Sequence, residues 1–166
     1  HVNMVIARPT PEDMADMTDR EKEGIASLQH YGTVGNGYST QQKTRPQTLG
    51  YGLADSPVGQ AAWIYEKFRE WSDAGDDPDA AFGQDHILDN IMLYWLGNAG
   101  TSSARLYWES FDSFGGTKVT IPSGGSIFKK EIFRPSRRWA ERNYTDLRYW
   151  NELDRGGHFA AFEVPD

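Results

Sequence analysis

The sequence is organised around the stretch Leu147-Arg-Tyr-Trp-Asn-Glu-Leu-Asp-Arg-Gly-Gly-His-Phe-Ala-Ala-Phe-Glu163. Its first part, up to Leu153, has the composition of a strand, and the pair Gly156-Gly157 then allows the backbone to turn sharply. The turn would hold His158 at the end of the strand, where an open α/β sheet keeps its chemistry. A histidine presented in this way can exchange a proton near neutral pH.

A histidine base needs a carboxylate on its other ring nitrogen, which fixes its tautomer and its orientation. Residues 118–121 are predicted to form a strand and residues 122–125 its exit loop, and Glu131 follows shortly afterwards. A helix over residues 135–144 would return the chain to the histidine strand. Because consecutive strands joined by one helix lie side by side, the loops of Glu131 and His158 are expected to meet at one sheet edge. Other acids compete for this role: Asp146, Glu152, Asp154 and Glu163.

The middle of the chain is predicted to be helical. Ser56 and Pro57 are typical of a helix start, and apolar residues at three- and four-residue spacing continue to Trp71. Further helices are expected over residues 11–31, 44–55, 86–96 and 101–111. A glycine-rich loop at residues 32–37 would lead to Tyr38, and Gly115-Gly116 would mark the return to strand. This order predicts an α/β fold with a mostly helical cap inserted into a sheet domain.

The expected division has three parts. Residues 1–10 would be the end of a core strand, residues 11–114 the helical cap, and residues 115–166 the last core strands and the loops that carry the acid and the histidine.

The composition excludes several classes of function. A net charge of −7 argues against nucleic acid or an anionic membrane as the main partner, because both attract clustered Lys and Arg. The 166 residues include no cysteine and no apolar run of the length that spans a bilayer. The histidines have no partners at metal-ligand spacing, so neither a metal nor a cofactor is expected. A cytoplasmic location is the corresponding expectation.

Four separated motifs follow one another in a recognisable order. They are Gly35-Asn-Gly-Tyr38-Ser-Thr-Gln-Gln, Asp55-Ser-Pro-Val-Gly-Gln-Ala-Ala-Trp63, Ser102-Ser-Ala-Arg-Leu-Tyr107 and Gly156-Gly-His-Phe-Ala-Ala-Phe-Glu163. Together they resemble the motifs of epoxide hydrolases of the microsomal type, which are α/β-hydrolases with a helical cap. The resemblance covers nearly all of the chain and implies the C-terminal portion of an α/β-hydrolase sheet domain with its cap.

In that family an aspartate attacks an epoxide carbon, and a water activated by histidine hydrolyses the resulting ester to a vicinal diol. The resemblance implies that Tyr38 and Tyr107 donate hydrogen bonds to the epoxide oxygen. It also implies that His158 activates the water and that Glu131 orients His158. Judged without the family, Tyr38 could be a surface turn residue, Tyr107 a core residue and His158 a structural strand-end histidine.

The nucleophile of this reaction is not found in the sequence. The chain has no Gly-x-Asp-x-Gly or Gly-x-Ser-x-Gly elbow and no His-Gly-x-Pro loop, both of which lie upstream in the family. We therefore expect a C-terminal part of an epoxide hydrolase. It would act on a small apolar epoxide and water together with an N-terminal half supplied by another chain or segment. The alternatives are an incomplete fragment or small-molecule binding module, and another cap-bearing hydrolase such as a haloalkane dehalogenase.

Overall fold

A computed structural model describes residues 1–110 and 117–165 and contains a small parallel sheet. Strand β1 (Ser123–Ile127) pairs in parallel with β2 (Leu147–Glu152). Val2 lies along the other edge of β1, where its N–H donates to the Gly124 carbonyl and its carbonyl accepts from the Ser126 N–H. The N-terminal segment therefore extends the sheet at that edge.

The prediction that residues 118–121 form the strand before Glu131 is wrong. Val119 forms only an isolated bridge with Tyr144, and β1 instead contains the glycines that the sequence assigned to a loop. A Cβ on Gly125 would lie 2.9 Å from the ring of Trp150. Glycine is thus needed for close packing within a strand rather than for a turn. The expected return to strand at Gly115-Gly116 lies outside the described residues.

The connection between the two strands is also shorter than expected. Helix α9 covers Arg137–Ala140 instead of residues 135–144. Beyond it, Val119 donates its N–H to the Asn143 carbonyl and accepts from the Thr145 N–H, and this pairing ends the helix. The strands are nevertheless parallel neighbours, as the sequence predicts, so the loops that follow them leave the same edge of the sheet.

The single helix expected over residues 11–31 is divided in two. Helix α1 covers Pro11–Ala15 and α2 covers Asp19–His30. Each begins with a capping box, and the second box, formed by Thr18 and Glu21, starts a new helix after the break. Glu21 is 3% exposed and receives two hydrogen bonds of 2.7 Å from Arg138, which lies in α9.

The buried Glu21 carboxylate should make part of the free energy of unfolding depend on pH. The Arg138 guanidinium lowers the pKa of Glu21 from its ordinary 4.5 to about 2. A lowered folded-state pKa gives a contribution that is complete above about pH 4.5 and is lost as the pH falls towards 2. Glu21→Gln should therefore lower the free energy of unfolding at pH 7 by about 2–3 kcal/mol, with the difference shrinking below pH 4. Urea unfolding at several pH values measures this difference. Glu141→Gln, which breaks the exposed pair with Arg137, is the matched control and should cost less than about 1 kcal/mol.

The chain remains helical where the sequence predicted a loop. Segment η1 (Tyr31–Gly35), a π-helix, is followed by α3 (Gly37–Thr44). Tyr38 therefore lies in the first turn of a helix rather than at the end of a flexible loop.

Four of the remaining helices agree well with the sequence. They are α4 (Pro46–Asp55), α5 (Pro57–Trp71), α7 (Gln84–Leu96) and α8 (Gly100–Ser110). Two short helices, α6 (Pro78–Phe82) and α10 (Ala160–Glu163), were not predicted. The Ser56 hydroxyl accepts from the Gly59 N–H and caps α5, as predicted.

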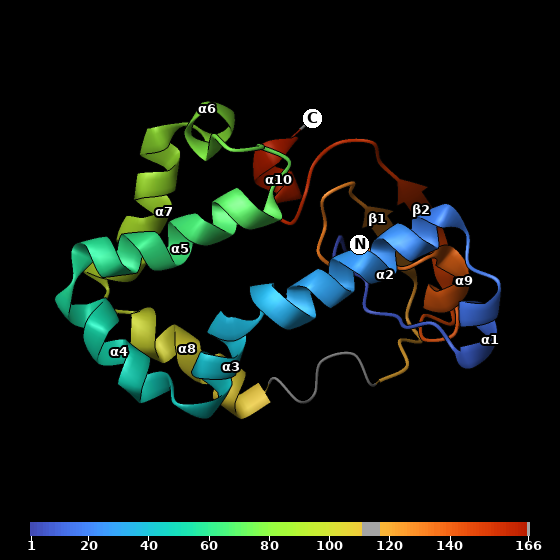
Figure 1. Ribbon diagram of the computed structural model, residues 1–166, viewed down its shortest axis with the longest axis horizontal. Coiled ribbons are helices and arrows are strands. Elements are labelled where there is room, and N and C mark those ends of the chain that lie inside the picture. Colours follow the sequence, from blue (N-terminus) through green and yellow to red (C-terminus); the bar gives the residue numbers. More distant parts are fainter. Residues whose placement is uncertain (111–116, 166) are drawn as a thin grey trace.

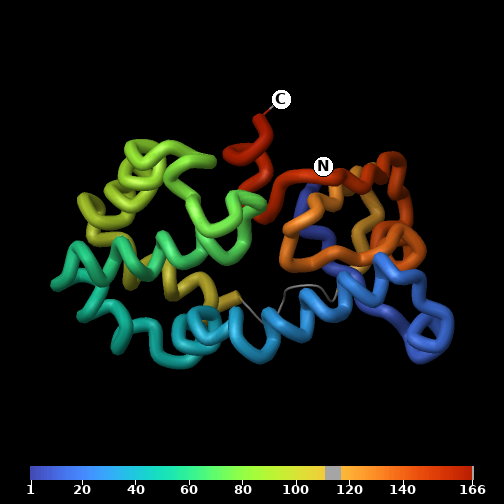
Figure 2. The backbone as a smooth tube through the Cα atoms, turned by 45° about the horizontal axis from the view of Figure 1, so that its top comes forward, coloured from blue at the N-terminus to red at the C-terminus, as the bar shows by residue number. Residues whose placement is uncertain are grey.

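The described residues form two groups joined by α2 (Figures 1 and 2). Helices α3 to α8 lie on one side, and the sheet with α1 and α9 lies on the other. The first group packs around Phe68, Phe82, Ile87 and Ile91, and the second around Val5, Ile127 and Ala140. Helix α10 returns to the first group and contacts α6. The chain after β2 thus crosses from the sheet to the helices, and His158 lies on this crossing.

Candidate active site

His158 lies in a loop that two glycines allow. Gly156 has a φ of +88°, in the left-handed region that favours glycine. A Cβ on Gly157 would lie 2.5 Å from the Trp71 carbonyl oxygen, which accepts the His158 N–H at 2.8 Å. The loop therefore packs directly against the C-terminal end of α5. The Gly-Gly turn places the histidine beyond the end of β2, as expected from the sequence.

His158 and Glu131 are in direct contact. Nδ1 of His158 is 2.7 Å from Oε1 of Glu131, whose side chain is fully buried. Oε1 also accepts the Ile132 N–H, and Oε2 accepts from Nδ2 of Asn3 at 2.9 Å. Because Nδ1 faces the carboxylate, Nε2 is the ring nitrogen available to a water molecule. The expected meeting of the two loops is thus observed.

Three of the four competing acids, Asp146, Glu152 and Glu163, have other partners. Asp146 forms a bidentate pair with Arg148, and Glu152 pairs with Arg20. Glu163 accepts the backbone N–H groups of Asp73 and Phe159 and so holds the histidine loop against the helices. The carboxylate that contacts His158 is Glu131, through the hydrogen bond at Nδ1.

Asn3 is a functional candidate that the sequence reasoning missed. Its amide donates to Glu131 and also, at 3.1 Å, to the carbonyl oxygen of His158, so it fixes both members of the pair. The sequence placed residues 1–10, Asn3 among them, at the end of a core strand and gave Asn3 no role. Only the pairing of Val2 with β1 brings it to this position, and such long-range pairing leaves no local signal.

Tyr38 and Tyr107 come together from α3 and α8. Their rings pack edge to face with centroids 5.7 Å apart, and the Tyr38 ring is 5.1 Å from that of Trp71. The hydroxyls of Tyr38 and Tyr31 share a hydrogen bond of 3.3 Å. Trp71 also contacts the His158 ring, with centroids 5.3 Å apart. One tryptophan therefore connects the tyrosine pair to the histidine.

Both phenols are held in their protonated form. Burial raises the pKa of Tyr38 well above its usual value, and the hydrogen bond with Tyr31 raises it further. Burial also raises the pKa of Tyr107, against the opposing effect of its hydrogen bond with Tyr38. A phenol that stays neutral can donate a hydrogen bond throughout the physiological range.

A cation lies beside the tyrosines. The Lys67 ammonium is 4.8 Å from the centre of the Tyr38 ring and 5.2 Å from that of Trp71, and its side chain is only 12% exposed. Its ion pair is with the neighbouring Glu66. The ammonium gives this part of the site a positive potential, which favours negative charge developing nearby.

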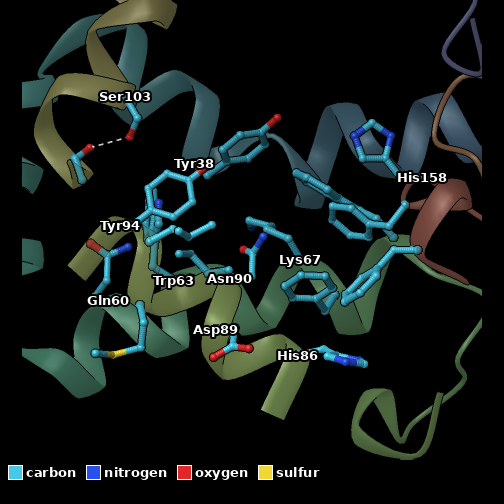
Figure 3. A pocket seen from close by; sticks show the side chains of 18 of the residues that line it. Tyr38, Gln60, Trp63, Lys67, His86, Asp89, Asn90, Tyr94, Ser103 and His158 are labelled. Atoms are coloured by element: carbon cyan, nitrogen blue, oxygen red, sulfur yellow. Dashed lines mark hydrogen bonds between the residues drawn. The ribbon is translucent and has the colours of Figure 1, made fainter. Parts of the chain in front are cut away.

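These residues face one cavity of about 1170 Å³ (Figure 3). His158, Tyr38, Tyr107 and Lys67 line it, while Glu131 lies behind His158. Much of the remaining wall is aromatic or aliphatic and includes Trp63, Phe68, Leu93 and Phe159. Such a cavity suits an apolar molecule that carries a small polar group.

The same part of the chain offers no metal site. Among residues 1–110 and 117–165, no group of three or more His, Asp or Glu side chains could hold a metal ion. None of the helices described is both long and apolar enough to cross a membrane.

Comparison with known proteins identifies relatives. No protein-family model matches the chain. The chain is 53% identical over 166 residues to the "Putative epoxide hydrolase" of Stigmatella aurantiaca, a match that covers 99% of this chain and 38% of that protein. It is 38% identical to Epoxide hydrolase 1 of Sus scrofa over 143 residues, covering 79% of this chain and 32% of the relative.

Solved structures of epoxide hydrolases also superpose on this chain. The epoxide hydrolase of Aspergillus niger superposes with a TM-score of 0.81 at 31% identity, over 96% of this chain and 40% of that one. The juvenile hormone epoxide hydrolase of the silkworm Bombyx mori superposes with a TM-score of 0.72 at 36% identity, over 78% of this chain and 36% of that one. The chain thus spans about 40% or less of the length of these relatives.

These matches define the class as α/β-hydrolases with a helical cap. Within that class, the chain is homologous to the C-terminal part of the epoxide hydrolases, and the resemblance seen in the sequence motifs is confirmed.

Proposed function

We propose that this chain forms the water-activating and oxygen-binding parts of an epoxide hydrolase active site. The observation that carries the proposal is that His158, held by the buried Glu131, faces the same cavity as the neutral phenols of Tyr38 and Tyr107. A small apolar epoxide suits this cavity, because its walls are largely apolar while the phenols supply donors for one oxygen atom. Water is the second substrate.

In the first step a carboxylate outside this chain attacks an epoxide carbon, and the carbon–oxygen bond breaks to give an ester. The epoxide oxygen gains negative charge as the bond breaks. Tyr38 and Tyr107 donate hydrogen bonds to it, and one phenol transfers its proton to form the alcohol. Lys67 stabilises the negative charge that is left on the phenol.

In the second step a water molecule lies against Nε2 of His158. The imidazole takes a proton from the water while the water oxygen attacks the ester carbonyl carbon. The Glu131 carboxylate on Nδ1 stabilises the imidazolium that forms, and Asn3 keeps both groups in position. The ester carbon–oxygen bond then breaks, and the leaving alkoxide takes the second proton of the attacking water, which completes the diol and regenerates the carboxylate. The proton on His158 restores the tyrosine phenol.

The chain spans 38% of the Stigmatella relative, which supports placing the attacking carboxylate in a part that this chain does not contain. We call this chain together with a nucleophile-bearing part, taken from its own protein or from that relative, the completed enzyme. The division of the chain at residues 10 and 114 and the cytoplasmic location stay predictions, as does the absence of nucleic-acid partners.

A turnover experiment tests the proposed function. The completed enzyme should convert a small epoxide such as styrene oxide to its diol, while the chain alone should give no diol above the uncatalysed rate. Chromatography of the diol measures both. Steady turnover by the chain alone would contradict the proposal, and so would an inactive completed enzyme that is folded and binds the diol. The latter result would favour a small-molecule binding module.

A further inference from the structure

The end of the cavity distant from His158 contains a buried amide. Gln60, on α5, is 2% exposed and lines the cavity near apolar side chains that include Leu53 and Trp63. Figure 3 shows Gln60 and His158 at opposite sides of the cavity, with Tyr38 between them. Trp71, which contacts His158, is eleven positions after Gln60 on α5, a rise of about 16 Å along the helix.

The Gln60 amide has no protein partner within the part of the chain that the structure describes. Neither its Nε2 nor its Oε1 forms a hydrogen bond with residues 1–110 or 117–165, although the residue is almost fully buried. A Cβ on Gly100 would lie 2.7 Å from Oε1, so a glycine at the start of α8 makes room for the amide. Buried polar groups normally have partners, and an amide at a cavity wall can obtain one from a ligand.

We infer that Gln60 marks a second binding subsite, which takes a neutral oxygen group of the substrate such as a hydroxyl, a carbonyl or an ether. This inference rests on the proposed function, because it names the kind of epoxide that the site prefers. Tyr107 is seven positions after Gly100 on α8, a rise of about 10 Å, and this distance sets the separation of the oxygen group from the epoxide. A neutral group fits best, since an uncharged amide does not offset the cost of burying an ion.

The subsite is selective because only some ligands can form a hydrogen bond with the Gln60 amide. A ligand with an oxygen group in the right place pairs with the amide, whereas a purely alkyl ligand of the same length leaves the amide unpaired and dry. Sites built in this way reject the analogue that lacks the polar group. Gln60 therefore distinguishes oxygen-bearing epoxides from plain alkyl epoxides at a point far from the reacting bond.

Binding to the full chain tests the subsite without any chemistry. The probes are two vicinal diols with alkyl chains that span the distance, one ending in a hydroxyl and one in a methyl group, and the signal is tryptophan fluorescence, because Trp63 and Trp71 line the cavity. Gln60→Met keeps the length of the side chain and removes the amide. It should weaken the hydroxyl-bearing diol relative to the alkyl diol by about tenfold. Gln47→Met, on the exposed side of α4, is the matched control and should leave the ratio unchanged.

An equal effect of Gln60→Met on both diols would overturn the inference, and so would the failure of the hydroxyl-bearing diol to bind to the unmodified chain. If Gln60→Met does not fold, Gln60→Asn withdraws the amide by one methylene and should lose part of the selectivity; an unchanged ratio would count against the subsite. The kcat/KM values of the completed enzyme for the two matching epoxides separate the two proposals. Turnover without selectivity rejects the subsite alone, and selective binding without turnover rejects the proposed function alone.

Discussion

Replacing His158 by glutamine in the completed enzyme is expected to stop the release of diol while leaving the opening of the epoxide intact. The imidazole acts only on the water of the second step, and glutamine cannot take its proton. Loss of a general base lowers a rate by about 10²- to 10⁴-fold. The variant should therefore consume about one epoxide per active site and then stall as the alkyl ester.

Rapid-quench kinetics measure the two steps of this variant separately, with the amount of epoxide consumed compared with the amount of diol formed. His30→Gln is the control, because His30 lies on the surface beside Glu70 and away from the cavity. Prompt diol release by His158→Gln would reject the assignment of His158 as the base. Loss of epoxide opening as well would show that His158 acts earlier than we propose.

Removing either phenol should affect the opposite step from His158→Gln, slowing the opening of the epoxide instead of the release of the diol. Tyr38→Phe and Tyr107→Phe each remove one donor to the epoxide oxygen, so ring opening should slow by about 10²-fold or more while hydrolysis of a preformed ester is unchanged. The double variant should lose more than either single one. Tyr51→Phe, at an exposed position on α4, is the control.

The pH profile provides a further check on the phenols. Because burial raises the pKa of Tyr38 and of Tyr107, both remain donors as the pH rises through 10. The rate of epoxide opening should therefore show no loss with a midpoint near 10. A decline at that midpoint would mean that a phenol with an ordinary pKa supplies the proton.

Local signals predicted those parts of the fold that local chemistry determines. Ser56 and Pro57 predicted the start of α5, and its apolar spacing predicted its end at Trp71, because capping and periodicity depend on neighbouring residues. The Gly156-Gly157 pair likewise predicted the turn before His158. The strand order then predicted that Glu131 would meet His158.

The errors and omissions arose where distant residues decide the outcome. Gly124 and Gly125 were read as a loop, since nothing nearby in the sequence indicates that Trp150 packs on them. Asn3 reaches the Glu131–His158 pair only through pairing of the first residues with β1. Gln60 has room at the cavity wall because the distant Gly100 has no side chain. The contact between Tyr38 and Tyr107 was implied by family motifs and not by composition.

The central claim is that this chain supplies the base and the oxygen donors and that the nucleophile lies elsewhere. Peptide mass mapping of the completed His158→Gln enzyme after exposure to epoxide tests it most directly, because the trapped ester marks the attacking residue. We predict that the added mass lies on a carboxylate outside the sequence of this chain. An adduct within the chain, for example on Asp89 in the cavity wall, would contradict the account.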